Sequence, residues 1–245
     1  MRLCYSSPFL MLLASLPLLA TPSVSGKVLP FRDIVVSAPV QGVIQEMAIR
    51  EGEIVAAGQP LARLRCRLEE LELQRAKAHL ERREFESKGS KKLYDSRIIS
   101  EAHALETRIG LELAKTNYES AAEQVKLRTL CAPIDGLVVE RMKDMGESVI
   151  PSQALFRVVD LRKVIVQGLF RAEDALRLRS GQKLKVRFPQ LEAALREGEI
   201  IFVDAVADPA SGCYRVKVLV ENPDLRIKAG LKAELEGLAT AAGGN

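Results

Sequence analysis

The chain is poor in the residue types on which most enzyme and nucleic-acid sites depend. Its 245 residues include no tryptophan and only two histidines, and aromatic residues make up 4% of the total. So few aromatic side chains argue against a stacking platform for single-stranded nucleic acid or sugar. The formal charge of +4, from 36 basic and 32 acidic residues, is too balanced to indicate nucleic acid as a partner.

Motifs for catalysis and metal binding are missing from the sequence as well. His79 and His103 fall in charged, helix-like segments, where we expect solvent-exposed side chains. The sequence has no serine in a glycine elbow, no glycine-rich loop that could cradle a phosphate, and no cysteine pair with zinc spacing. We therefore expect a protein that is not an enzyme and that holds neither a metal nor a cofactor.

Long hydrophobic runs are absent apart from one near the N-terminus. Residues 9–20 form an apolar run of 12 residues that is broken by Pro17. A helix needs about 20 residues to cross a bilayer core of about 30 Å. Arg2 precedes the run and small polar residues follow it. This pattern indicates that residues 1–25 are an export signal, cleaved after Ala20 or Ser25, in preference to a permanent anchor.

Export would leave three cysteines, Cys66, Cys131 and Cys213, and an odd number excludes a complete disulfide framework. Cys66 and Cys131 flank a long charged segment. If that segment is an antiparallel hairpin, the two thiols lie together at its base. They would then form either a disulfide or a pair of small buried side chains.

The chain repeats itself once, at a fixed distance of 94 residues. The 27 positions that begin at Ala38 and at Ala132 align without a gap and contain 10 identities. The identical residues are Ala38, Pro39, Gly42, Glu46, Gly52, Glu53, Val55, Gln59, Leu61 and Arg63, and Ala132, Pro133, Gly136, Glu140, Gly146, Glu147, Val149, Gln153, Leu155 and Arg157. Each copy indicates short strands and tight turns, and the matched glycines have structural roles. Two such units are too small to fold alone, so they should pack on each other.

The segment between the copies, residues 65–130, has a helical pattern. No proline lies between Pro60 and Pro133. Two apolar seams have heptad spacing: Leu64, Leu71, Ala78 and Phe85, with Leu68 between them, and Leu111, Ala114, Tyr118, Ala121 and Val125. The pattern predicts helices over residues 66–88 and 100–129, joined by a tip over residues 89–99. The first helix would project about 35 Å from the β repeats.

Beyond residue 160 the pattern alternates with the period of β-strands. The apolar segments cover residues 164–170, 183–188, 199–206, 213–220 and 230–235, with one short helix at 171–178. They predict a small antiparallel β-barrel over residues 161–238, followed by a tail over 239–245. The expected fold is thus mostly β: a split domain (33–64 plus 131–160), a helical hairpin (65–130) and a barrel.

The repeat resembles one half of a biotinyl/lipoyl domain. The shared residues are Ala38-Pro39, Gly42, Gly52-Glu53 and Gly58-Gln59, each with a counterpart in the second copy except Gly58, where Ser152 stands. In a carrier of that family, a lysine at the turn between the halves takes the cofactor. At that place this chain reads Leu64-Arg65-Cys66-Arg67 and enters the helical segment, so the attachment lysine is missing.

A split lipoyl domain that carries a helical hairpin and precedes a β-barrel resembles the HlyD-like membrane fusion proteins, the periplasmic adaptors of tripartite efflux pumps. The return into the second copy, residues 129–136, is similar to the family pattern T-x-x-A-P-x-D-G, and residues 208–231 resemble adaptors of RND-type pumps. The resemblance implies a periplasmic protein at the inner membrane. Its partners would be an inner-membrane efflux transporter, an outer-membrane channel and further copies of itself in a ring. The family's membrane-proximal β domain is expected to be missing or minimal.

The resemblance also implies a contact site at the hairpin tip. Leu93 and Ser100 match the family motif R-x-x-x-L-x-x-x-x-x-x-S, which engages the channel. Gly89 stands at the arginine position, with Lys88, Lys91 and Arg97 as candidate replacement cations. An adaptor of an ABC or major-facilitator exporter and a biotinyl/lipoyl carrier stay open as alternatives. A plain coiled-coil scaffold is disfavoured because it would not need matched β halves.

Overall fold

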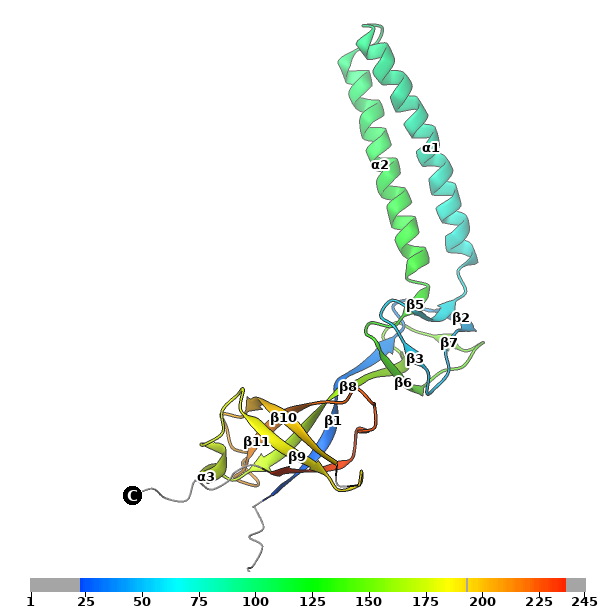
Figure 1. Ribbon diagram of the computed structural model, residues 1–245. Coiled ribbons are helices and arrows are strands. Elements are labelled where there is room, and N and C mark those ends of the chain that lie inside the picture. The colour runs from blue at the N-terminus through cyan, green and yellow to red at the C-terminus, as the bar shows by residue number, and fades with distance from the viewer. Residues whose placement is uncertain (1–22, 193, 237–245) are drawn as a thin grey trace, which may run out of the picture. The chain divides into compact units, whose positions relative to one another are not determined.

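The computed structural model describes residues 23–192 and 194–236, which fall into two compact units (Figure 1). The first unit holds residues 29–165 and 221–229, and the second holds the rest of the described chain. Two long strands, β1 (Val24–Ser37) and β8 (Ala154–Phe170), run from one unit into the other. The expected apolar run of the export signal and the tail from residue 239 onward lie outside the described residues.

The two copies of the repeat form two small antiparallel sheets in the first unit. One sheet has the strand order β5-β4-β2-β7, and in the other β6 pairs with both β8 and β3. The strands are β2 (Gly42–Met47), β3 (Ile54–Val55), β4 (Pro60–Leu64), β5 (Thr129–Cys131), β6 (Gly136–Arg141) and β7 (Ser148–Val149). Each copy supplies strands to both sheets, so neither copy forms a domain by itself.

Hydrogen bonds between the copies are reciprocal, as a pseudo-twofold axis requires. Gly42 of the first copy is aligned with Val149 of the second, and Val55 with Gly136, which are the same two repeat positions exchanged. The matched N–H to C=O bonds are Ala38 to Gln153 and Ala132 to Gln59, Ile44 to Glu147 and Val138 to Glu53, and Gly52 to Val138 and Gly146 to Ile44. The prediction that the two copies pack on each other is confirmed.

The core of this unit uses the same repeat positions twice. The matched pairs are Ile44 and Val138, Leu61 and Leu155, and Leu64 and Val158, and all six side chains are buried. Burying a side chain of this size stabilises the fold by about 1.5–3 kcal/mol. The apolar repeat residues therefore supply much of the free energy that holds the two halves together.

Two matched turns need a left-handed backbone. Gly52 and Gly146 have φ of 86° and 91°, where a side chain would be strained. At the next matched turn the copies differ, because Gly58 (φ 82°) corresponds to Ser152 (φ 66°). The second copy thus keeps the turn conformation without the residue that adopts it most easily.

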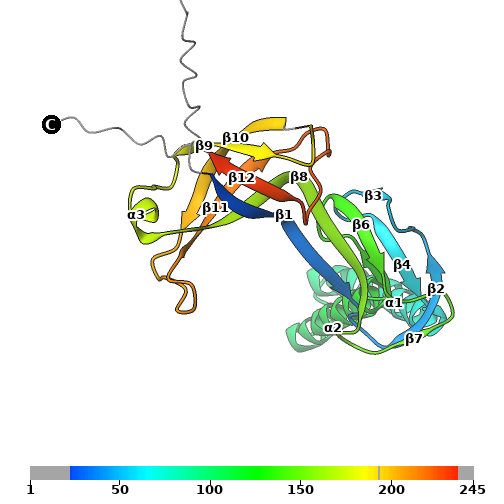
Figure 2. The ribbon, with the colours of Figure 1, turned by 90° about the horizontal axis from the view of Figure 1, so that it is seen from below.

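The second unit is the predicted antiparallel barrel, with strand order β1-β12-β9-β10-β11-β8 and closure by pairing of β1 with β8 (Figures 1 and 2). Its further elements are α3 (Ala172–Ala175), β9 (Lys183–Phe188), β10 (Ala194–Val203), β11 (Tyr214–Glu221) and β12 (Lys232–Glu236). Along β9, Leu184, Val186 and Phe188 are buried and alternate with exposed cations. This alternation is the period-two pattern from which the barrel was predicted.

The structure differs from the prediction at the edges of the barrel. The start of β1 supplies a sixth strand, in which Val24 is aligned with Leu235 of β12. The sequence analysis did not assign this strand, because its partner lies some 200 residues away along the chain. Residues 221–229, expected in the barrel, instead belong to the first unit, where the Asn222 amide donates to the carbonyls of Leu161 and Ile227.

Candidate functional site: the helical hairpin

The candidate site is the antiparallel pair α1 (Arg67–Asp95) and α2 (Glu101–Lys126), which leaves the first unit between β4 and β5 (Figure 1). The 29 residues of α1 extend over about 43 Å. The helix is longer than predicted because it continues through Gly89 to Asp95. A glycine inside a helix costs about 1 kcal/mol relative to alanine, and packing against α2 outweighs that penalty. The loop at the tip therefore shortens to residues 96–100.

Arg128 fixes the base of the hairpin to the first repeat. Its guanidinium donates to the carbonyl of Gln41 at 2.8 Å and to the carboxylate of Glu69, in the first turn of α1. Both side chains of the ion pair are 19% exposed, so water screens it only in part. Gly42 leaves room for this arrangement, since a Cβ there would lie 2.9 Å from a terminal nitrogen of Arg128. One side chain thus connects both helices to the β domain.

A second cluster at the base contains Cys66, Arg63 and Glu70. Arg63 donates to Glu70 at 2.7 Å and to the Cys66 sulfur at 3.3 Å, and the Cys66 thiol donates to Glu70 at 3.1 Å. Burial, together with the acceptor Glu70, raises the pKa of the Cys66 thiol. Cys66 is therefore a protonated hydrogen-bond donor at the start of α1, and not a reactive thiolate.

Cys66 and Cys131 do not meet, contrary to the expectation from the sequence. Both thiols are free, Cys66 is buried and Cys131 is exposed. Strand β5 runs antiparallel to β4, so Cys131 is aligned with Pro60 at the start of β4, whereas Cys66 follows the end of that strand. The structure thus contains no disulfide at the hairpin base, and only Cys66 behaves as a small buried side chain.

The contact face of α2 is the predicted one, whereas the predicted face of α1 is wrong. Ala114 and Ala121 are buried, and Leu111, Tyr118 and Val125 are partly buried. On α1, Leu68, Leu71 and Phe85 are 78%, 44% and 80% exposed, and Leu64 belongs to the β core. The residues of α1 that are less exposed and recur with heptad spacing are Leu73, Ala76, Leu80, Arg83, Ser87 and Ser90.

Polar contacts set the register between the two helices. The hydroxyl of Thr107 donates to that of Ser90 at 2.8 Å, and Ser90 is buried. Nearer the base of the hairpin, the guanidinium of Arg83 lies 3.8 Å from the place where a Cβ of Gly110 would be. The absence of a side chain at Gly110 thus lets a long cation lie across the contact. These polar residues explain why an apolar heptad failed to identify the face of α1 that meets α2.

The tip has a Schellman-type turn at the end of α1. The N–H of Ile98 donates to the carbonyl of Leu93, and that of Arg97 to the carbonyl of Tyr94, both at 2.8 Å. Arg97 occupies the left-handed position, with φ of 59°, where glycine is the usual residue. Ser100 is the N-cap of α2, and its hydroxyl accepts from the N–H of His103.

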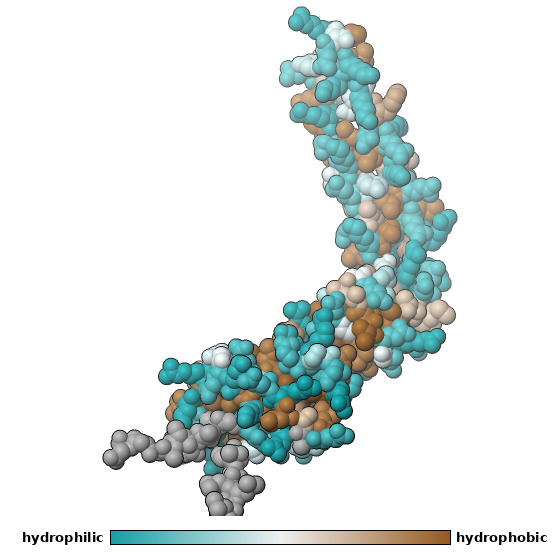
Figure 3. Space-filling view, in the orientation of Figure 1, coloured by the Kyte–Doolittle hydropathy of each residue, from teal (hydrophilic) through white to brown (hydrophobic). Residues whose placement is uncertain are grey.

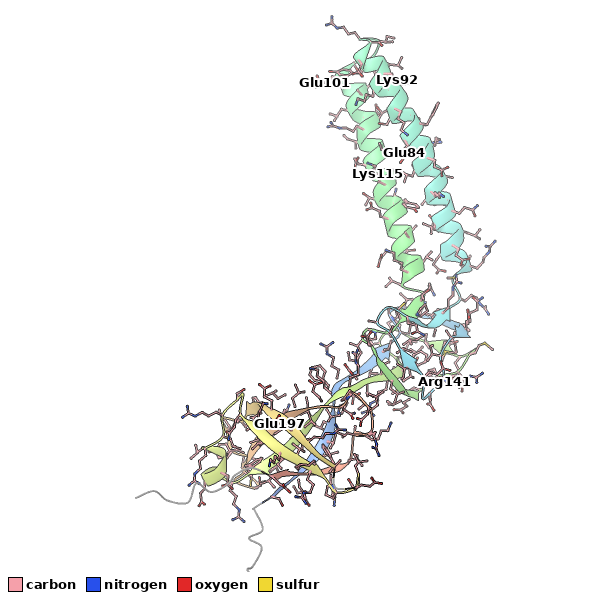
Figure 4. The ribbon with its side chains drawn as sticks, in the orientation of Figure 1. Glu84, Lys92, Glu101, Lys115, Arg141 and Glu197 are labelled. Atoms are coloured by element: carbon pink, nitrogen blue, oxygen red, sulfur yellow. The ribbon has the colours of Figure 1, made fainter. Side chains whose placement is uncertain are left out.

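The residues expected at the contact site thus lie at or near the tip. Leu93, in the last turn of α1, is 43% exposed. Lys88 and Lys91 project from the helix itself, whereas Arg97 lies in the tip loop. Figure 4 shows Lys92 and Glu101 near the tip; they place a cation in the last turn of α1 and an acid in the first turn of α2, as the helix dipoles favour.

The described part of the chain shows no grouping of three or more histidine, cysteine or acidic side chains that could hold a metal ion. His79 and His103 are exposed on the hairpin, as expected. Where a carrier domain would present its lysine, the chain passes from β4 through Cys66 into α1. None of the helices in residues 23–192 and 194–236 is both long enough and apolar enough to cross a membrane.

Comparison with known families agrees with this architecture. Residues 32–160, more than half of the chain, match the CzcB-like, barrel-sandwich hybrid domain family. The chain belongs to the CzcB-like barrel-sandwich hybrid family. Residues 170–240 match a second family, described as the CusB-like β-barrel domain. The first match lies within the first unit, and the second match covers most of the second unit together with residues 221–229 of the first.

Relatives of this CzcB-like chain include a metal resistance protein and a linker of an efflux pump. The cobalt-zinc-cadmium resistance protein CzcB of Cupriavidus metallidurans is 24% identical over 205 residues, which cover 78% of this chain and 39% of CzcB. The solvent efflux pump periplasmic linker SrpA of Pseudomonas putida is 24% identical over 245 residues, which cover 91% of this chain and 63% of SrpA. The chain thus spans less than two thirds of these relatives.

Solved structures show the same fold. A MacA–MexA chimeric protein with the Pseudomonas aeruginosa MexA α-hairpin domain superposes with a TM-score of 0.78 at 21% identity, over 88% of this chain and 78% of the chimera. The membrane fusion protein Spr0693 of Streptococcus pneumoniae superposes with a TM-score of 0.69 at 16% identity, over 88% and 98% of the two chains. The predicted fold class is confirmed.

Proposed function

We propose that this CzcB-like protein is a periplasmic adaptor, a membrane fusion protein that links an inner-membrane efflux transporter to an outer-membrane channel. The observation that carries the proposal is the hairpin: a rod of about 43 Å, fixed at its base by Arg128 and ending in an exposed tip. Such a rod suits contact with a distant partner. The names of CzcB and SrpA, a metal resistance protein and a periplasmic linker of a solvent pump, support a role in export.

Within this proposal the transporter is of the RND type, and the protein assembles with further copies of itself. The match of the second unit to a CusB-like barrel supports the choice of transporter over an ABC or major-facilitator exporter. Many modest contacts around a ring would together give a stable conduit. The protein acts by assembly and needs no catalytic residue. Identification of the transporter that co-purifies with the protein would distinguish an RND transporter from an ABC or a major-facilitator exporter.

Within this proposal the N-terminal signal is removed on export to the periplasm. Of the two expected cleavage points, the one after Ala20 leaves β1 whole, because Val24 and Ser25 are already aligned with Leu235 and Glu234 of β12. We therefore assign cleavage to Ala20. The intact mass of the protein isolated from the periplasm tests this assignment. A mass that corresponds to a chain beginning at residue 26 would refute it.

The tip is the proposed contact with the channel, through exposed Leu93, Ser100 and the cation Arg97. Ser100 has two separable roles, because it also caps α2. Ser100→Asp keeps a capping oxygen, whereas Ser100→Ala removes it at a cost of about 1 kcal/mol. If the hydroxyl contacts the channel, Ser100→Asp should impair export in cells while the hairpin stays as helical as in the parent.

The test of the adaptor role is crosslinking from the tip in intact cells. Cys131→Ser and Cys213→Ser remove the accessible native thiols, and Leu93→Cys then carries a thiol-reactive crosslinker. We expect capture of an outer-membrane protein. The matched control is His79→Cys, exposed in the lower half of α1, which should capture none. Equal capture from both positions, or none from position 93, would contradict the tip assignment.

A further inference from the structure

One end of the barrel presents apolar side chains to solvent. This is the end at which β1 begins and β8 ends, beside α3, and we call it the α3 end (Figures 1 and 2). Two loops cover it, residues 171–182 after β8 and residues 204–213 between β10 and β11. Leu176 in the first loop is 78% exposed, and Val206 in the second is 73% exposed. Figure 3 shows hydrophobic residues among the hydrophilic surface of this unit.

The outward position of Leu176 is fixed by its neighbours. Ala175 and Leu178 are 3% and 5% exposed, so they hold the loop on the barrel while the side chain between them points outward. The N–H of Gly181 donates to the carbonyl of Ile200 in β10 at 2.8 Å. Because the loop is already held by packing and by this hydrogen bond, a partner can meet Leu176 without an ordering cost.

The same loop carries three exposed arginines, Arg171, Arg177 and Arg179. In the part of the chain that the structure describes, none of their guanidinium groups lies in an ion pair. The acids of the loop, Glu173 and Asp174, precede Leu176, whereas two of the arginines follow it. An unpaired guanidinium keeps its donors available, and its planar fork fits the oxygens of a phosphate. The loop therefore combines an exposed apolar side chain with phosphate-binding groups.

Cations also surround an apolar residue near the end of β10, the strand to which this loop is bonded. Phe202 is 39% exposed, and the charged groups of Arg215 and Lys217 lie 6.0 and 5.8 Å from the centre of its ring. Arg215 also pairs with Asp204, in the second loop. Aromatic and long cationic side chains are typical of protein surfaces that lie at the polar boundary of a bilayer. The α3 end is thus both apolar and cationic.

The chain enters the barrel at this same end. The apolar run of the expected export signal ends at Ala20, and β1 begins at Val24. Four residues extend over at most about 14 Å. While the signal lies in the inner membrane, the α3 end is therefore held within about 14 Å of the bilayer. Cleavage after Ala20 removes this tether, and later contact with lipid then depends on the α3 end itself.

We propose that the α3 end binds an anionic phospholipid surface, with Leu176 at the level of the headgroups and the loop arginines on lipid phosphates. The proposal rests on the proposed export, which brings the barrel to the periplasmic leaflet of the inner membrane. Each inserted apolar side chain and each cation near an anionic surface adds to the binding. A protein partner fits less well, because separate apolar side chains among unpaired cations do not form the apolar centre of a protein interface.

Sedimentation with lipid vesicles tests the proposal. The protein isolated from the periplasm should bind vesicles that contain phosphatidylglycerol, should be released by high salt, and should bind pure phosphatidylcholine vesicles far less. Arg177→Glu should weaken the binding about tenfold or more, because it removes a cation and adds an acid. Leu176→Asp should weaken it by a similar factor. Both side chains are exposed, so neither change should lower the free energy of unfolding.

The matched controls lie toward the other end of the same unit. Leu195 is 51% exposed near the start of β10, and Lys232 is exposed at the start of β12. Leu195→Asp and Lys232→Glu make the same changes of charge and should leave vesicle binding unchanged. Equal losses from the controls and from the α3-end variants would show that net charge alone governs the binding, which would overturn the proposal.

Three further outcomes would also overturn it. The first is no binding to vesicles of either composition. The second is release by millimolar inorganic phosphate at constant ionic strength, which would assign the arginines to free phosphate. The third is loss of the co-purifying transporter in Arg177→Glu while vesicle binding stays intact, which would assign the α3 end to a protein partner. The first two results leave crosslinking from position 93 unaffected, so this proposal can fail while the adaptor function stands.

Discussion

Replacement of Gly136 by alanine should destabilise the first unit far more than the same replacement at its repeat counterpart, Gly42. An added Cβ at Gly136 would lie 2.5 Å from the carbonyl oxygen of Val159 and 3.1 Å from a methyl group of Val158. Both residues belong to β8, next to β6. Backbone in a paired strand cannot move aside without breaking the ladder, so we expect a loss of about 3 kcal/mol, at the upper end for overpacking.

Gly42 meets a different neighbour. Its added Cβ would lie 2.9 Å from a terminal nitrogen of Arg128 and 3.5 Å from Leu64, which is an ordinary contact distance. The arginine can rotate away, so the main loss is its hydrogen bond to Gln41 and part of its pairing with Glu69. We expect about 1 kcal/mol, together with faster amide exchange in the first turn of α1, because that turn loses its attachment.

Chemical denaturation followed by far-ultraviolet circular dichroism measures both variants. The helical signal comes mainly from α1 and α2, so it reports on the unit that holds both glycines. The expected difference between the variants is about 2 kcal/mol. A loss at Gly42 equal to or greater than that at Gly136 would refute the argument that backbone contact, and not repeat position, sets the penalty.

Three further predictions concern single residues. Ser152→Gly should raise the free energy of unfolding by about 1 kcal/mol, because the residue has the left-handed backbone of its counterpart Gly58; a loss on thermal denaturation would contradict this. Arg97→Gly should stabilise the tip by about 1 kcal/mol yet weaken channel capture. If the role of Arg97 were purely structural, tip stability and channel capture would both stay unchanged or would both change in the same direction. Arg157 donates two hydrogen bonds to Asp33 and lowers its pKa. This pair therefore stabilises the fold above the ordinary aspartate pKa of about 4 and is lost as the pH falls through the lower folded value, so Asp33→Asn should destabilise at pH 7 and have no effect in strong acid.

The sequence was sufficient to predict those features that depend on local pattern or on self-similarity. The 94-residue repeat predicted the packing of the two copies because each copy exposes the edges that the other needs, as with Gly42 and Val149. The period of two predicted the barrel strands, and β9 has the expected bounds. The candidate tip was also located, although α1 continues past Gly89, because contact with α2 outweighs the poor helix propensity of one glycine.

Features that depend on distant partners were not predictable in the same way. The first strand of the barrel pairs with residues at the other end of the chain, and no local pattern reports this. Cys66 and Cys131 stay apart because β5 is aligned with β4 in a register that places Cys131 opposite Pro60. A sequence shows which residues flank a hairpin, but not how far along a strand the return segment pairs.

The sequence by itself thus determined that the chain forms two β halves interrupted by a helical hairpin and followed by a barrel. Only the tertiary structure decided which face of α1 meets α2. Periodicity locates an apolar stripe around a helix, but it cannot tell which neighbour covers that stripe. The Ser90–Thr107 hydrogen bond and the absence of a side chain at Gly110 turn α1 so that Leu71 and Phe85 face outward. The apolar heptad of α1 therefore lies on the outside of the hairpin, because polar and small residues of α1 form its contact with α2.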